Sequence, residues 1–248
     1  MDGISELSSV YVVIPTYNEA ENLPLLVHRL FDLNVDGLGL IVVDDSSPDG
    51  TGELAKSLSA KYENVITVIS RSSKEGLGTA YKEGFELALH LGCDAVIQMD
   101  GDLSHRPEYI PEMLSLLGKY DVVVGSRYIE GGGSDDKWGL KRKVLSGVGN
   151  FGIKLVSGIQ VKDATSGFKA FRISTLRTIR WENILCKGFG FQSEVAFHCQ
   201  RLKYSVYEMP IVFEERLVGK SKMSIGIVLE AMFRMLFLRL FGHAGVQK

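Results

Sequence analysis

Residues 10–19 read VYVVIPTYNE, and this stretch decides the fold. Five residues rich in valine come first, and a polar run follows directly. A short, uninterrupted apolar run is typical of a strand that is buried on both faces of a parallel sheet. The polar run then falls at the carboxyl end of that strand, where open parallel sheets bind their ligands.

The same arrangement recurs along the first half of the chain. Short apolar runs bounded by turn residues predict strands at 40–43, 65–69, 95–99 and 121–124, and a later run predicts one at 206–213. Amphipathic stretches separate these runs, and Asn18 and Glu21 are spaced as a helix capping pair. Repeated strand–helix units predict an α/β fold with an open, mostly parallel sheet flanked by helices.

The composition is that of an ordinary globular protein. The chain has 248 residues, of which 45% are hydrophobic and 23% charged, and this excludes a disordered or collagen-like protein. Its three cysteines, Cys93, Cys186 and Cys199, form no Cys-x-x-Cys pair, which favours a reducing compartment. No basic segment followed by an apolar run opens the sequence, so we expect no signal peptide and a cytoplasmic location.

The formal net charge of −2 hides an asymmetry between the two halves. Residues 1–130 contain 9 Lys+Arg and 21 Asp+Glu, and residues 131–248 contain 19 and 9. An acidic front half favours a bound cation, and a basic back half favours phosphates or an anionic surface. Chance clustering of solvated charges is the plainer alternative.

The second half of the chain has a different character. Residues 129–139 hold four glycines and two aspartates, which predicts a mobile loop or lid. The tail at 224–241 is apolar but contains Glu230, Arg234 and Arg239. A helix of that length spans about 27 Å, and each central arginine costs about 2.5–3.5 kcal/mol in a bilayer, which argues against a spanning helix. An interfacial or partner-binding helix and an ordinary core helix both remain open.

Polar clusters follow four of the predicted strands. They read PTYNE at 15–19, DDSSPDG at 44–50, DGD at 100–102 and GSRY at 125–128. Each has a plainer explanation as a turn or a chance pair of acids, but their shared place at strand ends favours one site. Asp100 and Asp102 are of the type that holds Mg²⁺ or Mn²⁺, and Gly101 permits close backbone approach.

Two other nucleotide-binding patterns fail on the residues themselves. No Gly-x-Gly-x-x-Gly follows the first strand, as a dinucleotide-binding fold requires. Gly219-Lys220-Ser221 has the end of a phosphate-binding loop, but Glu214 stands where that loop needs its first glycine.

Six motifs in order carry a specific resemblance. They are PTYNE at 15–19, VDDSSPDGT at 43–51, DGDLSH at 100–105, GSRY at 125–128, TSGF at 165–168 and the segment 216–222. The chain resembles the dolichyl- and polyprenyl-phosphate mannose synthases, inverting GT-A-type glycosyltransferases of family two, from about residue 10 to 225. The resemblance implies a catalytic domain at 1–223, with a nucleotide and metal half (1–130) and an acceptor half (131–223), followed by an apolar, interfacial helix at 224–248.

The resemblance also implies roles for individual residues. Guanosine would contact Pro15, Tyr17, Glu19, Val43 and Asp45. The metal and the diphosphate would bind at Asp100, Gly101 and Asp102, with Arg127, Arg216 and Lys222 as cations around the phosphates. Arg127, Arg142 and Ser146 would grip the acceptor phosphate. In the plainer alternative Tyr17 is a core residue, Lys222 is solvated and Arg142 belongs to a generic basic face.

The chain departs from the family pattern at two positions and in its length. Gly101 replaces a common alanine, which should matter little, and Ser104 replaces a glutamine that some relatives place near the metal. Long relatives carry transmembrane helices after the catalytic domain, whereas this chain resembles the short class. That class lies peripherally on a membrane, here expected at its cytosolic face, or needs a small membrane subunit. We expect no nucleic-acid partner.

The reaction implied is transfer of mannose from GDP-mannose to a polyprenyl phosphate, with inversion and with Mg²⁺ or Mn²⁺. A phosphate monoester is already anionic at neutral pH, so no general base is obligatory, and we expect a binding or structural role for Glu194. The alternatives are a UDP-glucose-dependent glucosyltransferase, a non-catalytic nucleotide-sugar-binding subunit, and a metal-dependent phosphohydrolase that uses Asp100 and Asp102.

Overall fold

A seven-stranded sheet forms the centre of the protein. The computed structural model describes residues 7–63, 65–136, 138–215 and 225–241. The strand order is β3-β2-β1-β4-β7-β5-β8, and only β7 is antiparallel to its neighbours. The strands are β1 (Val10–Thr16), β2 (Leu38–Asp44), β3 (Ile66–Ser70), β4 (Ala95–Gln98), β5 (Val122–Ser126), β7 (Lys169–Arg172) and β8 (Val206–Pro210). The predicted α/β fold with a mostly parallel sheet is confirmed.

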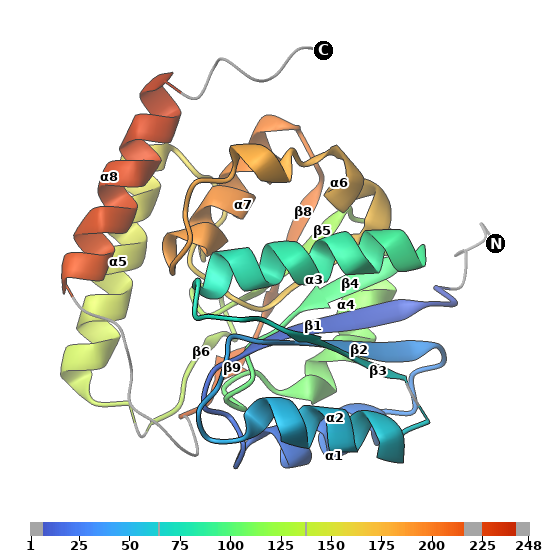
Figure 1. The fold of residues 1–248 in the computed structure, drawn as a ribbon. Coiled ribbons are helices and arrows are strands. Elements are labelled where there is room, and N and C mark those ends of the chain that lie inside the picture. Colours follow the sequence, from blue (N-terminus) through green and yellow to red (C-terminus); the bar gives the residue numbers. More distant parts are fainter. Residues whose placement is uncertain (1–6, 64, 137, 216–224, 242–248) are drawn as a thin grey trace.

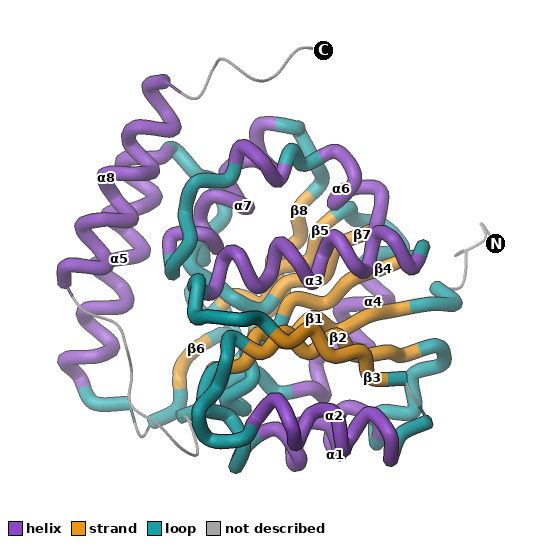
Figure 2. The backbone as a smooth tube through the Cα atoms, viewed as in Figure 1, coloured by secondary structure: helices purple, strands orange, loops and turns teal. Residues whose placement is uncertain are grey.

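Helices cover both faces of the sheet (Figures 1 and 2). One face packs against α1 (Leu23–Phe31), α2 (Thr51–Lys61), η1 (Pro107–Tyr109) and α4 (Ile110–Leu116). The other packs against α3 (Leu77–Leu91), α6 (Ile173–Thr178), η2 (Trp181–Asn183) and α7 (Gly190–Arg201). Side chains alternate between the two cores: Val12 and Ile14 face the first, and Val13 faces the second. Because both faces are buried, β1 and β2 have no exposed row of polar residues.

Two long helices stand side by side at one end of the sheet, α5 (Leu140–Ser157) and α8 (Ile225–Phe241) (Figure 1). The apolar tail therefore forms a helix, and its inner side has the character of a core helix. Ala231, Met235 and Leu238 are buried in a third cluster with Ile153 of α5 and Phe197 of α7. Its outer side is apolar but exposed. None of the helices described in the structure is long and apolar enough to cross a membrane.

Two local predictions are wrong, and one strand was missed. The run at 206–213 is not one strand, because the chain leaves the main sheet after β8 and pairs β9 (Val212–Phe213) with β6 (Gly133–Ser134). The strand β7 was not predicted, since four residues that begin with Lys169 and end with Arg172 give no apolar run. Asn18 does not cap a helix: it has a left-handed backbone (φ 61°), and α1 begins later, at Leu23.

Candidate functional site

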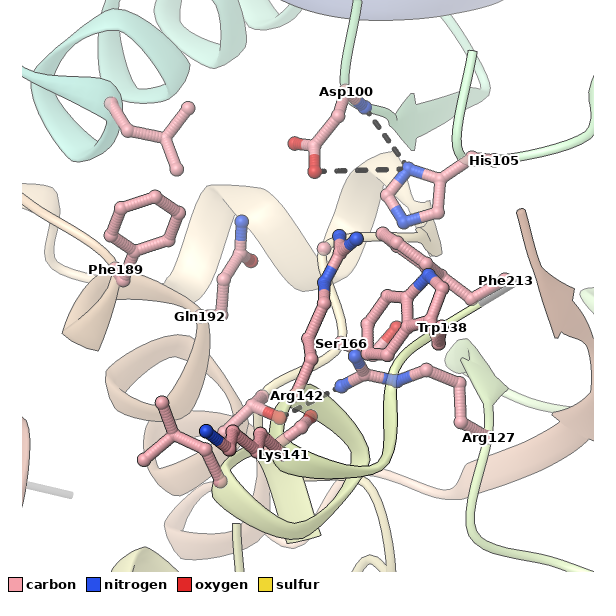
Figure 3. A pocket seen from close by; sticks show the side chains of 15 residues that line it. Asp100, His105, Arg127, Trp138, Lys141, Arg142, Ser166, Phe189, Gln192 and Phe213 are labelled. Carbon is pink, nitrogen blue, oxygen red and sulfur yellow. Dashed lines mark hydrogen bonds and ion pairs between the residues drawn. The ribbon is translucent and has the colours of Figure 1, made fainter. Parts of the chain in front are cut away.

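Two cavities open where β1, β2, β4 and β5 end, and they meet at Asp100. The acidic cavity has a volume of about 250 Å³ and is lined by residues that include Pro15, Tyr17, Glu19, Asp45, Lys74, Asp100, Gly101 and Asp102. The basic cavity has a volume of about 300 Å³ and is lined by residues that include Asp100, His105, Arg127, Trp138, Lys141, Arg142, Ser146 and Gln192 (Figure 3). Leu77, Asp100 and Phe189 line both cavities.

Asp100 is held by neutral partners and stays partly open. Its carboxylate, 27% exposed, accepts a hydrogen bond of 2.9 Å from the buried hydroxyl of Tyr81. Its backbone N–H donates to Nδ1 of His105 at 3.2 Å. Burial, and then the charge of Asp100, raises the pKa of Tyr81, so this hydroxyl keeps its proton. Burial lowers the pKa of His105 against the attraction of Asp100 and Asp102, so the ring is neutral at neutral pH.

Asp102 faces the same edge of the acidic cavity. It is 5% exposed and accepts hydrogen bonds from the backbone and hydroxyl of Ser104, at 3.1 and 2.5 Å. Ser104 therefore orients Asp102 here. A Cβ on Gly101 would lie 3.4 Å from Ile14 and from the carbonyl of Pro15, an ordinary contact that leaves room for alanine.

Two carboxylates at one cavity edge fit a hard divalent cation, whose preferred ligands are oxygens. Asp100 and Asp102 are the residues that could hold it. Within the described part of the chain, no group of three or more His, Cys, Asp or Glu side chains could hold a metal ion.

The predicted guanosine residues fall into two groups. Pro15, Tyr17, Glu19 and Asp45 line the acidic cavity, and the ammonium of Lys74 lies 3.4 Å from the centre of the Tyr17 ring. Val43 does not line it. Its side chain is fully buried in the core beneath α3, because it lies two residues after Ile41 on β2 and so shares the same face. The expected apolar contact with a base therefore does not come from the Val43 side chain.

Asp45 is already engaged within the protein. One oxygen accepts from Arg71 at 2.7 Å and from the backbone of Glu75 at 3.1 Å, and the other accepts from the backbone of Gly76 at 3.1 Å. The side chains of Asp45 and Arg71 are 7% and 3% exposed. This buried pair fixes the loop between β3 and α3 at the wall of the acidic cavity.

Arg127 forms a comparable buried pair in the basic cavity. Its guanidinium donates to both oxygens of Asp163 at 2.8 and 2.9 Å, and to Thr165 at 2.9 Å. Burial alone would lower the pKa of Arg127, but Asp163 outweighs burial and raises it. Burial alone would raise the pKa of Asp163, but Arg127 holds it below its ordinary value. The charge of Arg127 is therefore largely balanced inside the protein.

Arg142 is more accessible. Its guanidinium lies 3.8 Å from the centre of the Trp138 ring and donates to Glu215 at 2.5 Å, with side chains that are 23% and 35% exposed. Figure 3 shows this guanidinium reaching into the cavity. Ser146, one helical turn later on α5, shares a hydrogen bond of 2.8 Å with the hydroxyl of Tyr128. The structure thus brings Arg127, Arg142 and Ser146 to one cavity.

Three further residues complete the account of the predicted site. Arg216 and Lys222 lie outside the described residues. Glu194 is fully buried on α7 and accepts from the backbone N–H groups of Leu185 and Cys186 at 3.0 and 2.8 Å. It does not line either cavity, and it holds the segment that leads to Phe189.

Comparison with known proteins identifies the family. Residues 11–180 match the model of glycosyl transferase family 2. The chain is 44% identical to the undecaprenyl-phosphate mannosyltransferase of Micrococcus luteus over 223 aligned residues, and these cover 90% of each of the two chains. It is 40% identical over 224 residues to the polyprenol monophosphomannose synthase of Mycolicibacterium smegmatis, covering 90% of this chain and 84% of that one. The chain belongs to glycosyl transferase family 2.

Solved structures agree on the fold of this family 2 glycosyltransferase. Glucosyl-3-phosphoglycerate synthase from Mycobacterium tuberculosis, solved with Mn²⁺, UDP and glucosyl-3-phosphoglycerate, matches with a TM-score of 0.64 and 18% identity over 99% of this chain and 85% of that one. Mannosyl-3-phosphoglycerate synthase from Rubrobacter xylanophilus matches with a TM-score of 0.66 and 17% identity over 97% and 76%. At these identities the likeness concerns the fold, and it confirms the expected GT-A fold.

Sequence reasoning about this family 2 glycosyltransferase missed several residues that line the cavities or lie directly behind their walls. Tyr81 and His105 hold Asp100, Trp138 supports Arg142, and Lys169 is a fully buried cation whose pKa burial lowers to about 8. A tyrosine on a helical apolar stripe is usually a core residue, so its pattern gave no signal of a site. Lys169 gave no signal either, because the sequence did not predict the strand β7 that buries it.

Proposed function

We propose that the chain transfers mannose from GDP-mannose to a polyprenyl phosphate, with inversion at the anomeric carbon. The observation that carries this proposal is the pair of cavities that share Asp100, one lined by carboxylates and the other by arginines. A reaction between a nucleotide sugar and an anionic acceptor needs two such subsites side by side. The names of the two relatives described above support mannose as the sugar and a polyprenyl phosphate as the acceptor.

The acidic cavity would take the donor. Tyr17, Glu19 and Asp45 would face guanosine, with Lys74 beside them, and Asp100 and Asp102 would hold Mg²⁺ or Mn²⁺ on the diphosphate. When bound, the ion supplies positive charge that stabilises the departing diphosphate. Arg127, Arg216 and Lys222 remain the proposed cations around the phosphates. The neutral hydroxyl of Tyr81, which donates to the Asp100 carboxylate, suits this role because it leaves the negative charge of Asp100 available.

The basic cavity would take the acceptor phosphate. Arg142 and Ser146 would contact its oxygens, and in doing so the phosphate would replace Glu215 on Arg142. A phosphate monoester has a second pKa of about 6, so its oxygen attacks the anomeric carbon without first losing a proton to the protein. The contribution of these residues is orientation, which converts an encounter of two ligands into a reaction within one complex. Attack from the side opposite the diphosphate inverts the sugar.

An apolar path suits the prenyl chain of the acceptor. A narrow slot of about 40 Å³ between α5 and α8 shares Leu145, Ser146, Thr165 and Phe189 with the basic cavity. A Cβ on Gly149 of α5 would lie 3.3 Å from Val228 of α8, so a larger side chain there would narrow the slot. We propose that the prenyl chain leaves the phosphate site in the direction of this slot, between the two helices.

The outer sides of α5 and α8 suit a membrane surface. Their exposed apolar side chains, which we call the apolar face, are Leu140, Val144, Val148, Phe151 and Leu155 of α5 and Leu229, Phe233, Leu236, Phe237, Leu240 and Phe241 of α8. An apolar surface of this extent marks an interaction site. We propose that it lies on the lipid that supplies the acceptor, at the cytosolic face, directly or through a small membrane subunit. The three free, buried cysteines fit that compartment.

The test is incubation of the purified protein with Mn²⁺ and labelled GDP-mannose, with and without polyprenyl phosphate. We expect label to move to the lipid only when the acceptor is present, and to be lost with a chelator. Transfer from UDP-glucose, and not from GDP-mannose, would overturn the proposal that GDP-mannose is the donor. Release of free sugar or phosphate would indicate a hydrolase, and saturable binding without turnover would indicate a nucleotide-sugar-binding subunit.

A further inference from the structure

Gln192 lies on α7 and lines the basic cavity, although its exposed fraction is only 3%. Its amide oxygen accepts a hydrogen bond from the buried ammonium of Lys169 at 3.0 Å and a second from the amide of Gln98. Its amide nitrogen is buried and has no hydrogen-bond partner. Buried polar groups are nearly always paired, so an orphan donor at a cavity wall indicates a missing partner.

Two neighbours fix which end of the amide faces the cavity. A lysine ammonium has only donors, so the Gln192 atom toward Lys169 must be the oxygen. The amide of Gln98 cannot be turned round to accept from Gln192. Its nitrogen also donates at 3.1 Å to the backbone carbonyl of Gly167, and a carbonyl can only accept. The Gln192 nitrogen is therefore directed away from this network. Figure 3 shows it turned toward the end of the cavity where Asp100 lies.

The place of Gln192 limits what the missing partner can be. The proposed diphosphate site at Asp100 and the proposed acceptor phosphate site at Arg142 and Ser146 border the same cavity as Gln192. The transferred sugar has to lie between them. The phosphates on either side have charged partners in the proposed complex. The uncharged N–H of Gln192 suits an uncharged acceptor, and the hydroxyl oxygens of a hexose are acceptors of this kind.

We propose that Gln192 determines specificity for the sugar, by donating its amide N–H to one hydroxyl of the hexose in the nucleotide-sugar donor. Lys169 and Gln98 act as positioning residues that hold the amide in this orientation. This inference rests on the proposed function, since it needs the sugar of a donor bound in the acidic cavity to reach past Asp100 to Gln192. It adds a contact that recognises the sugar and not the nucleotide.

The test compares binding of GDP, GDP-mannose and the four GDP-mannose analogues that lack the 2-, 3-, 4- or 6-hydroxyl, measured by calorimetry with Mn²⁺. Gln192→Glu keeps an oxygen toward Lys169 and Gln98 but removes the donor. Gln200→Glu is the matched control, because Gln200 lies on the same helix, outside both cavities, and its amide donates to the carbonyl of Gly158.

We expect one analogue to bind the wild type about 10-fold more weakly than GDP-mannose, as a lost hydrogen bond to a buried donor does. In Gln192→Glu that analogue and GDP-mannose should bind equally, while the affinity for GDP stays within about threefold of the wild type. The control variant should behave as the wild type does.

The proposal is overturned if Gln192→Glu still distinguishes every analogue that the wild type distinguishes. It is also overturned if the variant loses GDP and GDP-mannose affinity equally, which would indicate charge repulsion of the nucleotide. A wild type that binds UDP-glucose in preference to GDP-mannose would refute the proposed donor alone. The same series made on UDP-glucose then decides the role of Gln192.

Discussion

The acidic and basic cavities each combine a charge that is balanced within the protein with a charge that is available to ligands. Asp45 is buried against Arg71, and Arg127 is buried against Asp163. The carboxylate of Asp100 accepts from the neutral hydroxyl of Tyr81, and Arg142 has only a partly exposed ion pair. Breaking a buried pair costs about 3–5 kcal/mol because it strands a charge, whereas an exposed pair contributes about 0–1 kcal/mol. The balanced charges therefore hold the walls of the site, even where they face a ligand, and the available charges can bind a ligand without breaking a buried pair.

The sharpest test of this difference is to neutralise one aspartate of each kind. Asp100→Asn should lower mannose transfer by about 10³-fold, because it removes half of the proposed cation site, with little change in the free energy of unfolding. Asp45→Asn should destabilise the fold by about 1–3 kcal/mol, since Arg71 loses its buried partner and keeps only the more exposed Glu75 and Glu83. Radiolabel transfer and urea unfolding measure the two effects. Equal loss of stability in both variants would contradict the distinction.

The corresponding test in the basic cavity uses arginine. Arg142→Ala should lower transfer about 100-fold at low acceptor concentration, because a phosphate loses a charged partner, while GDP affinity stays unchanged. Arg29→Ala is the matched control, as Arg29 pairs with Glu108 on the surface beside α1. The rate is measured as a function of acceptor concentration. Loss of GDP binding in Arg142→Ala would mean that the cavities do not divide donor and acceptor between them.

Changes to the apolar face should affect membrane binding and leave nucleotide binding unchanged. Phe233 is 71% exposed, and Phe233→Ser should weaken binding to vesicles that contain anionic lipid about tenfold, as expected for one buried aromatic side chain. GDP affinity should not change. Leu25→Ser, which alters an exposed leucine on α1, is the control. Unchanged vesicle binding together with an altered oligomeric state would assign the face to protein contacts.

A smaller effect is expected at Glu194, which supports a cavity wall without lining it. Glu194→Gln removes one of two hydrogen bonds to the backbone and should lower stability by about 1–2 kcal/mol. Transfer should fall by less than about tenfold, because the proposed mechanism has no general base. If the variant kept its GDP-mannose affinity but lost turnover entirely, the base-free mechanism would be wrong.

The smallest effect concerns pH. Burial lowers the pKa of His105 and His198 below the usual value of 6.5, against the attraction of nearby carboxylates. The unfolded chain therefore binds protons more readily at these two histidines than the folded protein does. The free energy of unfolding is unaffected by this difference above pH 6.5 and decreases as the pH falls below it. Urea unfolding at several pH values from 5 to 8 should show this decline. His198→Gln should make the decline shallower, and an unchanged slope would refute the assignment.

The acidic cavity could be predicted from the sequence to a large extent. Its residues follow apolar runs directly, and the carboxyl ends of parallel strands meet at one edge of a sheet. The buried position of the Val43 side chain could not be predicted, because a strand buried on both faces has no polar alternation to reveal which way each side chain points.

The basic cavity could not be assembled from spacing alone. Arg142 and Ser146 were assigned only through family resemblance, and Trp138 and Gln192 were not found at all. Their meeting depends on how α5 and α7 pack, and on β7, whose four residues carry no strand signal. The orientation of the Gln192 amide depends in particular on Lys169, 23 residues earlier, which is buried against it.

The central claim is that the edge shared by the two cavities binds a divalent ion and the diphosphate of the donor. The most direct measurement is the anomalous scattering of Mn²⁺ in crystals soaked with GDP. We predict a single strong manganese peak within bonding distance of the carboxylates of Asp100 and Asp102 and of the β-phosphate of GDP. A manganese peak and a nucleotide found at another part of the molecule would contradict the account.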